Sequence, residues 1–317
     1  FEVVTIVALR YFVAQKCDLV IWETGMGGRL DATNIVTPLA SVMTNVQLDH
    51  QPWLGDTIEK IAVEKAGIIK AGVPVLTAAD EPSVLTVIEE TARSHNAPLT
   101  IVGQGPRLKA AGMAALSLLG EHQKINAALA LATVDSLQKQ IPVAAEKIRE
   151  GLATINWPGR LQLIETSTRQ RILLDGAHNV AGAQVLRKAL EEYFPVVQRT
   201  LILGVLQDKD WRRICETLAP PATRILLVPV QSERTANAGE LAVACSVANP
   251  SAKVAACASL GEALEEAATD NFVVIAGSLY LVGEALQKLD LSTADVGERG
   301  LNEWHAPAQP AAVCVAP

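Results

Sequence analysis

Short apolar runs and helical patterns alternate along most of this 317-residue chain. The runs that we expect to be strands are 73–76, 99–102, 171–174, 201–205, 225–228 and 272–276. Helical patterns separate several of them, for example at 83–95 and 180–193. Each helix can carry the chain back so that the next strand runs parallel to the last. The sequence therefore predicts an α/β fold with mostly parallel sheets.

Proline and glycine interrupt this alternation near the middle of the chain, at Pro158 and Gly159. A chain of this length suits two domains of ~100–200 residues each. We predict a first domain at 1–156 and a second at 157–290. Residues 291–317 lack an apolar period, and we expect them to form a disordered tail.

The bulk composition limits the classes of partner. A net charge of -7, a pI near 5.4 and the lack of a basic stripe argue against nucleic-acid and membrane partners. The cysteines form no C-x-x-C pair, which suits a reducing compartment and neither disulfides nor a zinc site. They are Cys17, Cys215, Cys245, Cys257 and Cys314. With no signal peptide or membrane-length apolar run, we expect a cytoplasmic monomer that binds small molecules.

Two polar sites follow apolar runs in the first 50 residues. The run at 19–22 ends on Glu23 and leads into a glycine-rich turn at 24–34, while the run at 40–46 is followed by Asp49 and His50. If both runs are parallel strands of one sheet, their carboxyl ends share the edge at which such sheets bind ligands. Glu23 and His50 would then face each other across a crevice.

The next helix carries a lysine on its buried face. Asp56 and Glu59 have the spacing of a helix start, and Gly67 is a typical stop. Lys65 shares a face with the apolar residues Ile58, Ile61, Ala62 and Ala66, whereas Lys60 points elsewhere. Burial can lower a lysine pKa by up to ~3–5 units, and a neutral amine can react with carbon dioxide to form a carbamate, an anionic oxygen ligand. Alternatively, Lys65 extends its ammonium to the surface.

Segments 23–34, 48–50 and 64–70 resemble, in order, motifs of the folylpolyglutamate synthase and dihydrofolate synthase family of Mur-type ligases. The resemblance extends from Phe1 to about residue 290. It implies an incomplete P-loop-type ATPase domain followed by a Rossmann-like glutamate-ligase domain. It also implies that Glu23 and His50 bind Mg²⁺ and that Lys65 is carbamylated and joins them as a ligand.

Further roles come from the same resemblance. It implies that Asn126, Arg160 and Asp175 contact ATP and that His178 is catalytic, near the incoming glutamate or the reacting phosphate. Residues expected to border the pterin substrate are Phe1, Glu2, Leu30, Asp31 and Ala32. Structural alternatives remain open: Glu2, Asn126 and His178 could simply serve helix starts, and Arg160 could be an exposed residue near a linker.

Ser278 is a candidate that comes from the residues alone. Gly277 and Ser278 stand at the start of a helical pattern, where backbone N–H groups can hold an anion. We expect Ser278 to bind a carboxylate of glutamate, although helix capping alone would explain the same residues.

One element of an ATP-using ligase is not found in this sequence. There is no G-x-x-x-x-G-K-[ST] loop to hold a triphosphate, and the chain does not begin with methionine. We therefore expect an N-terminally truncated ligase that binds ATP poorly. The glycines at 25–28 do not have the context of a dinucleotide-binding motif, because residues 29–34 do not open a helix.

The resemblance implies a function. It is ATP-dependent ligation of L-glutamate to dihydropteroate or a reduced folate, through an acyl phosphate and with Mg²⁺ as cofactor. Two alternatives remain: a non-catalytic remnant of such a ligase, and a Mur-type ligase that acts on a cell-wall precursor.

Overall fold

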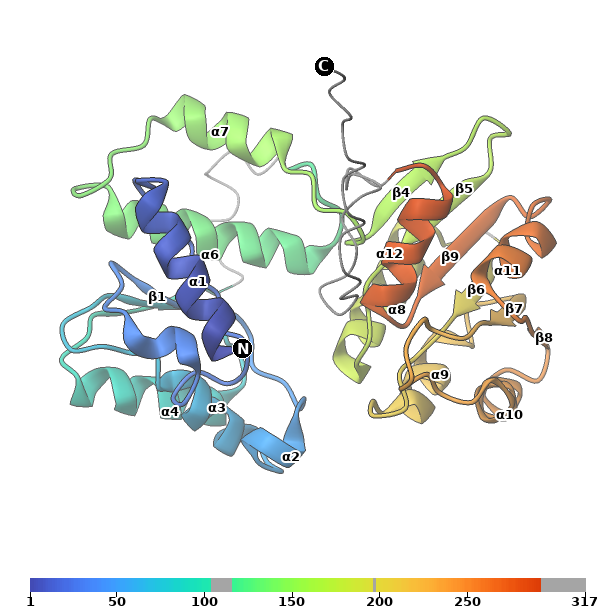
Figure 1. Ribbon diagram of the computed structural model, residues 1–317, viewed down its shortest axis with the longest axis horizontal. Helices are drawn as coiled ribbons and strands as arrows, with labels where there is room; N and C mark the ends of the chain where they lie inside the picture. The colour runs from blue at the N-terminus through green and yellow to red at the C-terminus, as the bar shows by residue number, and fades with distance from the viewer. Residues whose placement is uncertain (104–115, 196–197, 292–317) are drawn as a thin grey trace, which may run out of the picture.

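A computed structural model describes residues 1–103, 116–195 and 198–291 of the chain. Two α/β parts lie side by side, with helices α6 (Glu121–Leu137) and α7 (Ala145–Thr154) between them in the sequence (Figure 1). We call residues 1–103 the three-stranded part and residues 159–291 the six-stranded part. The tail expected at 291–317 lies outside the described residues except for Leu291. The domain boundary expected between 156 and 157 stays a prediction.

The three-stranded part is a small parallel sheet between helices. Its strands are β1 (Ser41–Met43), β2 (Val75–Thr77) and β3 (Leu99–Ile101), in that order across the sheet. Its helices are α1 (Glu2–Ala14), the 3-10 helix η1 (Ala32–Ile35), α2 (Gln51–Leu54), α3 (Ile58–Ala66) and α4 (Pro82–Ser94). Buried side chains of α3 and α4 pack on one face of the sheet, and Leu129 of α6 packs against Leu76 on the other. The sheet is thus covered on both faces, as parallel sheets require.

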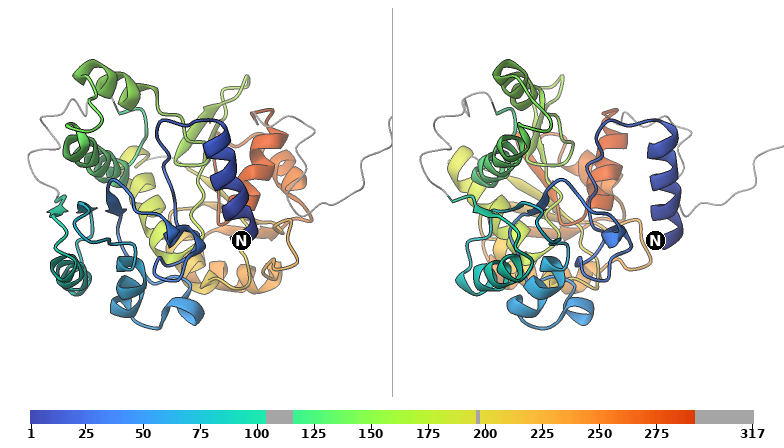
Figure 2. Two further views of the ribbon diagram at one scale, coloured as in Figure 1. Left: turned by 60° about the vertical axis from the view of Figure 1, so that its left-hand side comes forward. Right: turned by 90° about the vertical axis from the view of Figure 1, so that its left-hand side faces the viewer.

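The prediction of a strand at 19–22 is wrong. These residues form no strand and pair with no described strand, and β1 forms an edge of the sheet. Ile21 is 93% exposed, so an apolar run here does not mark a buried strand. Trp22 holds the segment instead: its Nε1 donates to the Thr33 carbonyl oxygen at 2.9 Å, and its ring meets Phe12 of α1 edge to face. Figure 2 shows α1 at the outside of the three-stranded part.

The six-stranded part confirms the predicted alternation of strands and helices. Its strands are β4 (Gln162–Glu165), β5 (Arg171–Leu174), β6 (Thr200–Leu203), β7 (Arg224–Leu227), β8 (Lys253–Ala256) and β9 (Phe272–Ala276). They lie in the order β4-β5-β9-β6-β7-β8, and all neighbours are parallel except β4 and β5. The fold class is therefore the expected mostly parallel α/β type.

Helices cover both faces of this larger sheet. They are α8 (Val180–Tyr193), α9 (Trp211–Leu218), α10 (Ala238–Ala248), α11 (Leu260–Glu266) and α12 (Leu279–Lys288). Alternate residues of the strands point to opposite cores: Leu173 packs toward α8, α9 and α10, whereas Ile172 packs toward α11 and α12. None of the described helices is long and apolar enough to cross a membrane.

The glycine-rich turn lies directly against the end of α3. The Arg29 N–H donates to the Glu64 carbonyl oxygen at 2.7 Å, and the Asn34 side chain donates to the Gly67 carbonyl oxygen at 3.0 Å. A Cβ added at Gly67 would overlap with Cα and Cβ of Arg29, so only glycine permits this approach. The contact fixes the turn, which follows Glu23, relative to Lys65.

We therefore expect Gly67→Ala to push the turn away from α3 and to destabilise this part by about 1–3 kcal/mol, the usual cost of overpacking. Gly151→Ala in α7 is the matched control, because an added Cβ there meets nothing within 4 Å. In that helix alanine should stabilise the protein by about 0.5–1 kcal/mol. Thermal unfolding of both variants measures the difference, and equal melting temperatures would rule out the tight contact.

Candidate active site

A cavity of about 420 Å³ opens between the glycine-rich turn, the residues after β1 and α3. Its lining includes Glu23, His50 and Lys65, the three residues expected to converge, together with Asp49. We call it the Lys65 cavity. Although Glu23 does not follow a strand, the turn still brings it to the same cavity as His50.

Helix α3 places Lys65 as the apolar spacing predicted. The helix begins one residue later than expected, with the Thr57 hydroxyl accepting the Lys60 N–H at 3.3 Å. Ile61 is fully buried and lines the cavity beside the half-buried Lys65. Lys60 points away and pairs with Asp56 at 2.6 Å. Burial lowers the pKa of the Lys65 ammonium, and the nearby Asp49 carboxylate acts in the opposite direction.

Asp49 connects this cavity to the other part of the molecule. Its Oδ1 accepts a hydrogen bond from Lys209 Nζ at 3.0 Å, and its Oδ2 accepts one from Asn179 Nδ2 at 3.1 Å. Burial alone would raise the pKa of Asp49, but these hydrogen bonds outweigh it and lower the pKa to about 2. Asp49 is therefore a carboxylate at neutral pH. His50 follows it in a left-handed conformation, φ 52°, at the start of α2, with an exposed side chain.

The donor set fits Mg²⁺ on one condition. No three His, Cys, Asp or Glu side chains gather closely enough for a metal ion in the described parts of the chain. Glu23 and His50 thus need a further ligand, and an unmodified Lys65 ammonium cannot be one. A carbamate on Lys65 would supply anionic oxygens, and Mg²⁺ commonly completes its shell with water and substrate phosphates. The set fits the ion when Lys65 is modified.

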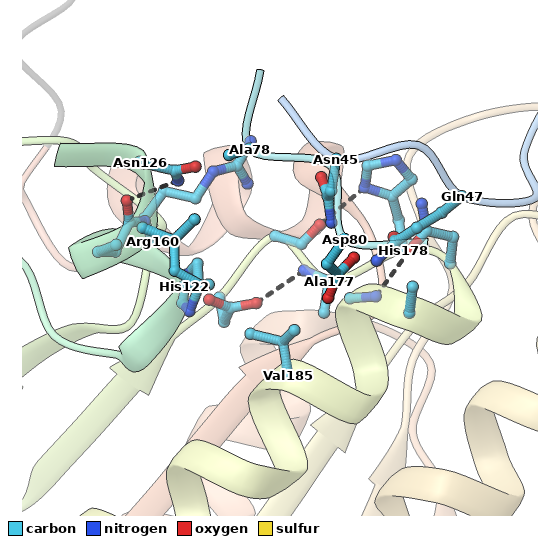
Figure 3. A pocket seen from close by; sticks show the side chains of 17 residues that line it. Asn45, Gln47, Ala78, Asp80, His122, Asn126, Arg160, Ala177, His178 and Val185 are labelled. Atoms are coloured by element: carbon cyan, nitrogen blue, oxygen red, sulfur yellow. Dashed lines mark hydrogen bonds between the residues drawn. The ribbon is translucent and has the colours of Figure 1, made fainter. Parts of the chain in front are cut away.

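A second cavity, of about 320 Å³, lies between the two parts and α6. Its lining includes the predicted residues Asn126, Arg160, Asp175 and His178. We call it the Asp175 cavity. Figure 3 shows Asn126 and Arg160 at one end, and His178 with Asn45 and Gln47 at the other. The structure therefore brings together side chains from α6, from the junction and from the loop after β5.

The loop after β5 is built around the Asp175 carboxylate. Asp175 is 9% exposed, and its two oxygens accept the backbone N–H groups of Leu161 and Ala177, each at 2.9 Å. Burial raises the pKa of Asp175, while the two N–H donors and the Arg160 guanidinium act in the opposite direction. The carboxylate thus ties the start of the six-stranded part, near Arg160, to the loop that carries His178.

His178 is not the cap of the following helix. Asn179 caps α8, with its Oδ1 accepting the Gly182 N–H at 2.8 Å. His178 Nδ1 instead lies 2.8 Å from the Gly176 carbonyl oxygen, which can only accept, so Nδ1 carries the proton. In the neutral ring Nε2 is then a free acceptor. The capping alternative for His178 is therefore wrong.

Positive charge lies at the other end of the Asp175 cavity. Arg160 follows Gly159, whose left-handed conformation at φ 72° favours glycine. His122 of α6 lines the same cavity, and burial followed by the charge of Arg160 lowers the pKa of its imidazole. Asn126, one turn on, is exposed, and its Nδ2 donates to Gln123 Oε1 at 3.1 Å. Arg160 thus offers a cation in the same cavity as the hydrogen-bonding groups of His122 and Asn126.

The two cavities adjoin, because Asn45 and Gln47 line both of them. These two residues, like Lys209 and Asn179, are not among the site residues predicted from the sequence. A signal was available: all four lie just past the carboxyl ends of strands β1, β5 and β6, the edge where open parallel sheets bind ligands.

Other predicted residues lie outside the linings of these two cavities. Asp31 caps η1 and its Oδ2 accepts the Met26 N–H at 2.8 Å, so it shapes the turn, while its neighbours Leu30 and Ala32 flank it. The Phe1 ring packs on Gly25, which lines the Lys65 cavity, and Glu2 begins α1. Ser278 is buried and caps α12. Substrate binding by these residues stays a prediction.

Comparisons with known proteins agree with this arrangement. Residues 159–279 match the family model "Mur ligase, glutamate ligase domain". The chain is 33% identical to a dihydrofolate synthase/folylpolyglutamate synthase of Bacillus subtilis, over 91% of this chain and 72% of the relative. It is 35% identical to a folylpolyglutamate synthase of Lacticaseibacillus casei, over 91% and 71%.

A solved structure shares the fold as well. It is a folylpolyglutamate synthase of Mycobacterium tuberculosis complexed with ADP and AMPPCP, which superposes with a TM-score of 0.80 at 29% identity and covers 91% of this chain and 72% of its own. The identity and coverage of the two sequence relatives confirm the resemblance found in the sequence motifs. This chain belongs to the folylpolyglutamate synthase/dihydrofolate synthase family of Mur-type ligases.

Proposed function

We propose that this chain catalyses the ATP-dependent ligation of L-glutamate to dihydropteroate, to a reduced folate, or to both. The observation that carries the proposal is the junction of the two cavities at Asn45 and Gln47. One cavity holds the residues expected to bind ATP, and the other holds those expected to bind Mg²⁺. A phosphoryl group on its way from nucleotide to acceptor needs both sets within reach.

The chemistry needs positioned charges and no protein nucleophile. The carboxylate of the pterin substrate attacks the γ-phosphate of ATP to give an acyl phosphate and ADP. The amine of glutamate then attacks the acyl carbon and releases phosphate. Arg160 suits the nucleotide phosphates, because its planar guanidinium can donate two parallel hydrogen bonds. Asn126 and Asp175 offer an amide and a carboxylate along the same cavity. Enclosure between the two parts would exclude the water that hydrolyses an acyl phosphate.

Glu23, His50 and a carbamylated Lys65 are the residues that would hold Mg²⁺. When bound, the ion would neutralise negative charge that accumulates on the transferring phosphoryl group. The lowered pKa of Lys65 favours the neutral amine that carbon dioxide requires. The tight fit of the glycine-rich turn on α3 keeps Glu23 and Lys65 on one cavity.

His178 is proposed to act on the incoming amine. With Nδ1 held by the Gly176 carbonyl oxygen, Nε2 can accept a proton as the amine attacks. The ring lies at the end of the Asp175 cavity nearest Asn45 and Gln47, where the two cavities meet (Figure 3).

Phosphate release tests the function. We expect release that requires ATP, glutamate and either dihydropteroate or tetrahydrofolate together, and none with a UDP-linked cell-wall precursor. The difference follows from the folate-ligase relatives, whose chains align with 91% of this one. Release with only the cell-wall precursor would favour the rival Mur-type ligase. No release from any mixture, with nucleotide still bound, would identify a non-catalytic remnant.

A further inference from the structure

In the described parts of the chain, one carboxylate at the Lys65 cavity, that of Asp49, accepts hydrogen bonds from the six-stranded part. Among the described residues, the hydrogen bonds between residues 1–103 and 159–291 both end on Asp49: one from Lys209 and one from Asn179. The Asp49 side chain is itself fixed, because Oδ1 also accepts the His50 N–H at 2.8 Å. The same carboxylate therefore accepts the backbone N–H of a predicted metal ligand and hydrogen bonds from two loops of the other part.

Both donors are anchored by the larger sheet. Asn179 follows β5 and uses its Oδ1 to cap α8, so only its Nδ2 is available for Asp49. Lys209 follows β6, in a loop whose Gln207 N–H donates to the Arg234 carbonyl oxygen at 2.7 Å. The two hydrogen bonds thus tie Asp49 to two loops that leave neighbouring regions of the same sheet.

The ion pair is also sheltered from water. The Asp49 side chain is 26% exposed and that of Lys209 13%, whereas most other described ion pairs have at least one side chain that is 38% exposed or more. Exposed pairs contribute little, but a sheltered pair with fixed partners resists screening and constrains geometry. Such a pair is suited to setting the distance between two parts.

We propose that Asp49 is a positioning residue that couples the Lys65 cavity to the loops bearing His178 and Lys209. The role rests on the proposed ligase reaction: with Asp49 in place, the glutamate-side residues of the six-stranded part are held against the acyl phosphate formed at the cavity junction. Without it, the two parts separate and the second half-reaction, attack by the amine, suffers most.

Small-angle X-ray scattering and ligase kinetics on five variants test the proposal. Asp49→Asn and Lys209→Gln keep the size of each side chain and remove its charge. Both should increase the radius of gyration, and both should lower kcat/KM for glutamate about 10²-fold, the loss that ~1 Å of misplacement can cause. The double variant should be no worse than Asp49→Asn alone, because Asp49→Asn already removes the ion pair that Lys209→Gln removes. Lys209→Arg, which keeps the charge, should restore most of the activity.

Asp208→Asn is the matched control. Asp208 lies in the same loop as Lys209, but its ion pair with Arg234 is exposed and lies within the six-stranded part. This variant should leave both the scattering and the kinetics unchanged. The proposal is overturned if Asp49→Asn and Lys209→Gln scatter like the parent protein, or if their effects simply add. Scattering needs no turnover, so failure of the ligase reaction and failure of the positioning role remain distinguishable.

Discussion

Lys65→Ala is expected to lower ligase turnover by about 10²–10³-fold, the usual cost of removing one group that stabilises transition-state charge. Among the described residues that line the Lys65 cavity, Lys65 is the only lysine. The variant therefore removes the amine that carbon dioxide could convert to an anionic ligand. The buried neighbours Ile61 and Ala62 hold α3 in place, so the fold should survive. Steady-state phosphate release, with circular dichroism to check folding, measures the effect.

Lys60→Ala is the control for this variant. Lys60 lies on the same helix, is exposed and pairs only with Asp56, so its loss should change turnover less than twofold, in line with the small energy of exposed pairs. Addition of a short carboxylic acid should partly rescue Lys65→Ala, because it returns anionic oxygens to the cavity. Full activity of Lys65→Ala without such an acid would remove the lysine from the site.

Of the variants proposed for this protein, Asp175→Ala is expected to cause the largest combined loss of folding stability and nucleotide affinity. The change leaves the Leu161 and Ala177 N–H groups without their acceptor, and each such buried group costs about 1–3 kcal/mol. It also frees Arg160 from its neighbouring carboxylate and reshapes the Asp175 cavity. Thermal unfolding and calorimetric titration with AMPPCP measure the two effects.

Asp175→Asn separates the two roles of this carboxylate. The amide keeps one acceptor oxygen, so one N–H group stays satisfied and the loss of stability should be about half that of alanine. Nucleotide affinity should still fall, because the amide nitrogen cannot accept the backbone N–H group that the lost carboxylate oxygen accepted, so the loop beside Arg160 is held less firmly. If both variants unfold at the same temperature as the parent protein and bind AMPPCP with the same affinity, Asp175 has neither role.

Local patterns predicted most of the fold because they report burial directly. Strands β5 and β9 and helix α8 begin and end at the expected residues, since each is an apolar element bounded by polar turns. The apolar run at 19–22 misled for the same reason: its side chains are apolar but exposed, and no strand pairs with it. Edge strands β4 and β8 were missed because their exposed residues carry a weak apolar signal.

The residues of the candidate site also fall into two groups: those that a local sequence pattern predicts and those that it does not. The face on which Lys65 lies follows from the helical repeat, so spacing alone predicted it. The bonds from Asn179 and Lys209 to Asp49 join residues 130 and 160 positions apart, which no local pattern contains. Predictions from composition, namely a cytoplasmic monomer without nucleic-acid or membrane partners, stay predictions.

We propose that Glu23, His50 and a carbamylated Lys65 together hold one divalent cation. Crystals grown with bicarbonate and Mn²⁺, a scattering substitute for Mg²⁺, test it through the anomalous signal of the metal. We expect one Mn²⁺ peak in the Lys65 cavity, within ligand distance of Glu23 and His50, with extra density for a carboxyl group on Lys65 Nζ. An unmodified Lys65 together with no Mn²⁺ peak between these residues would contradict it.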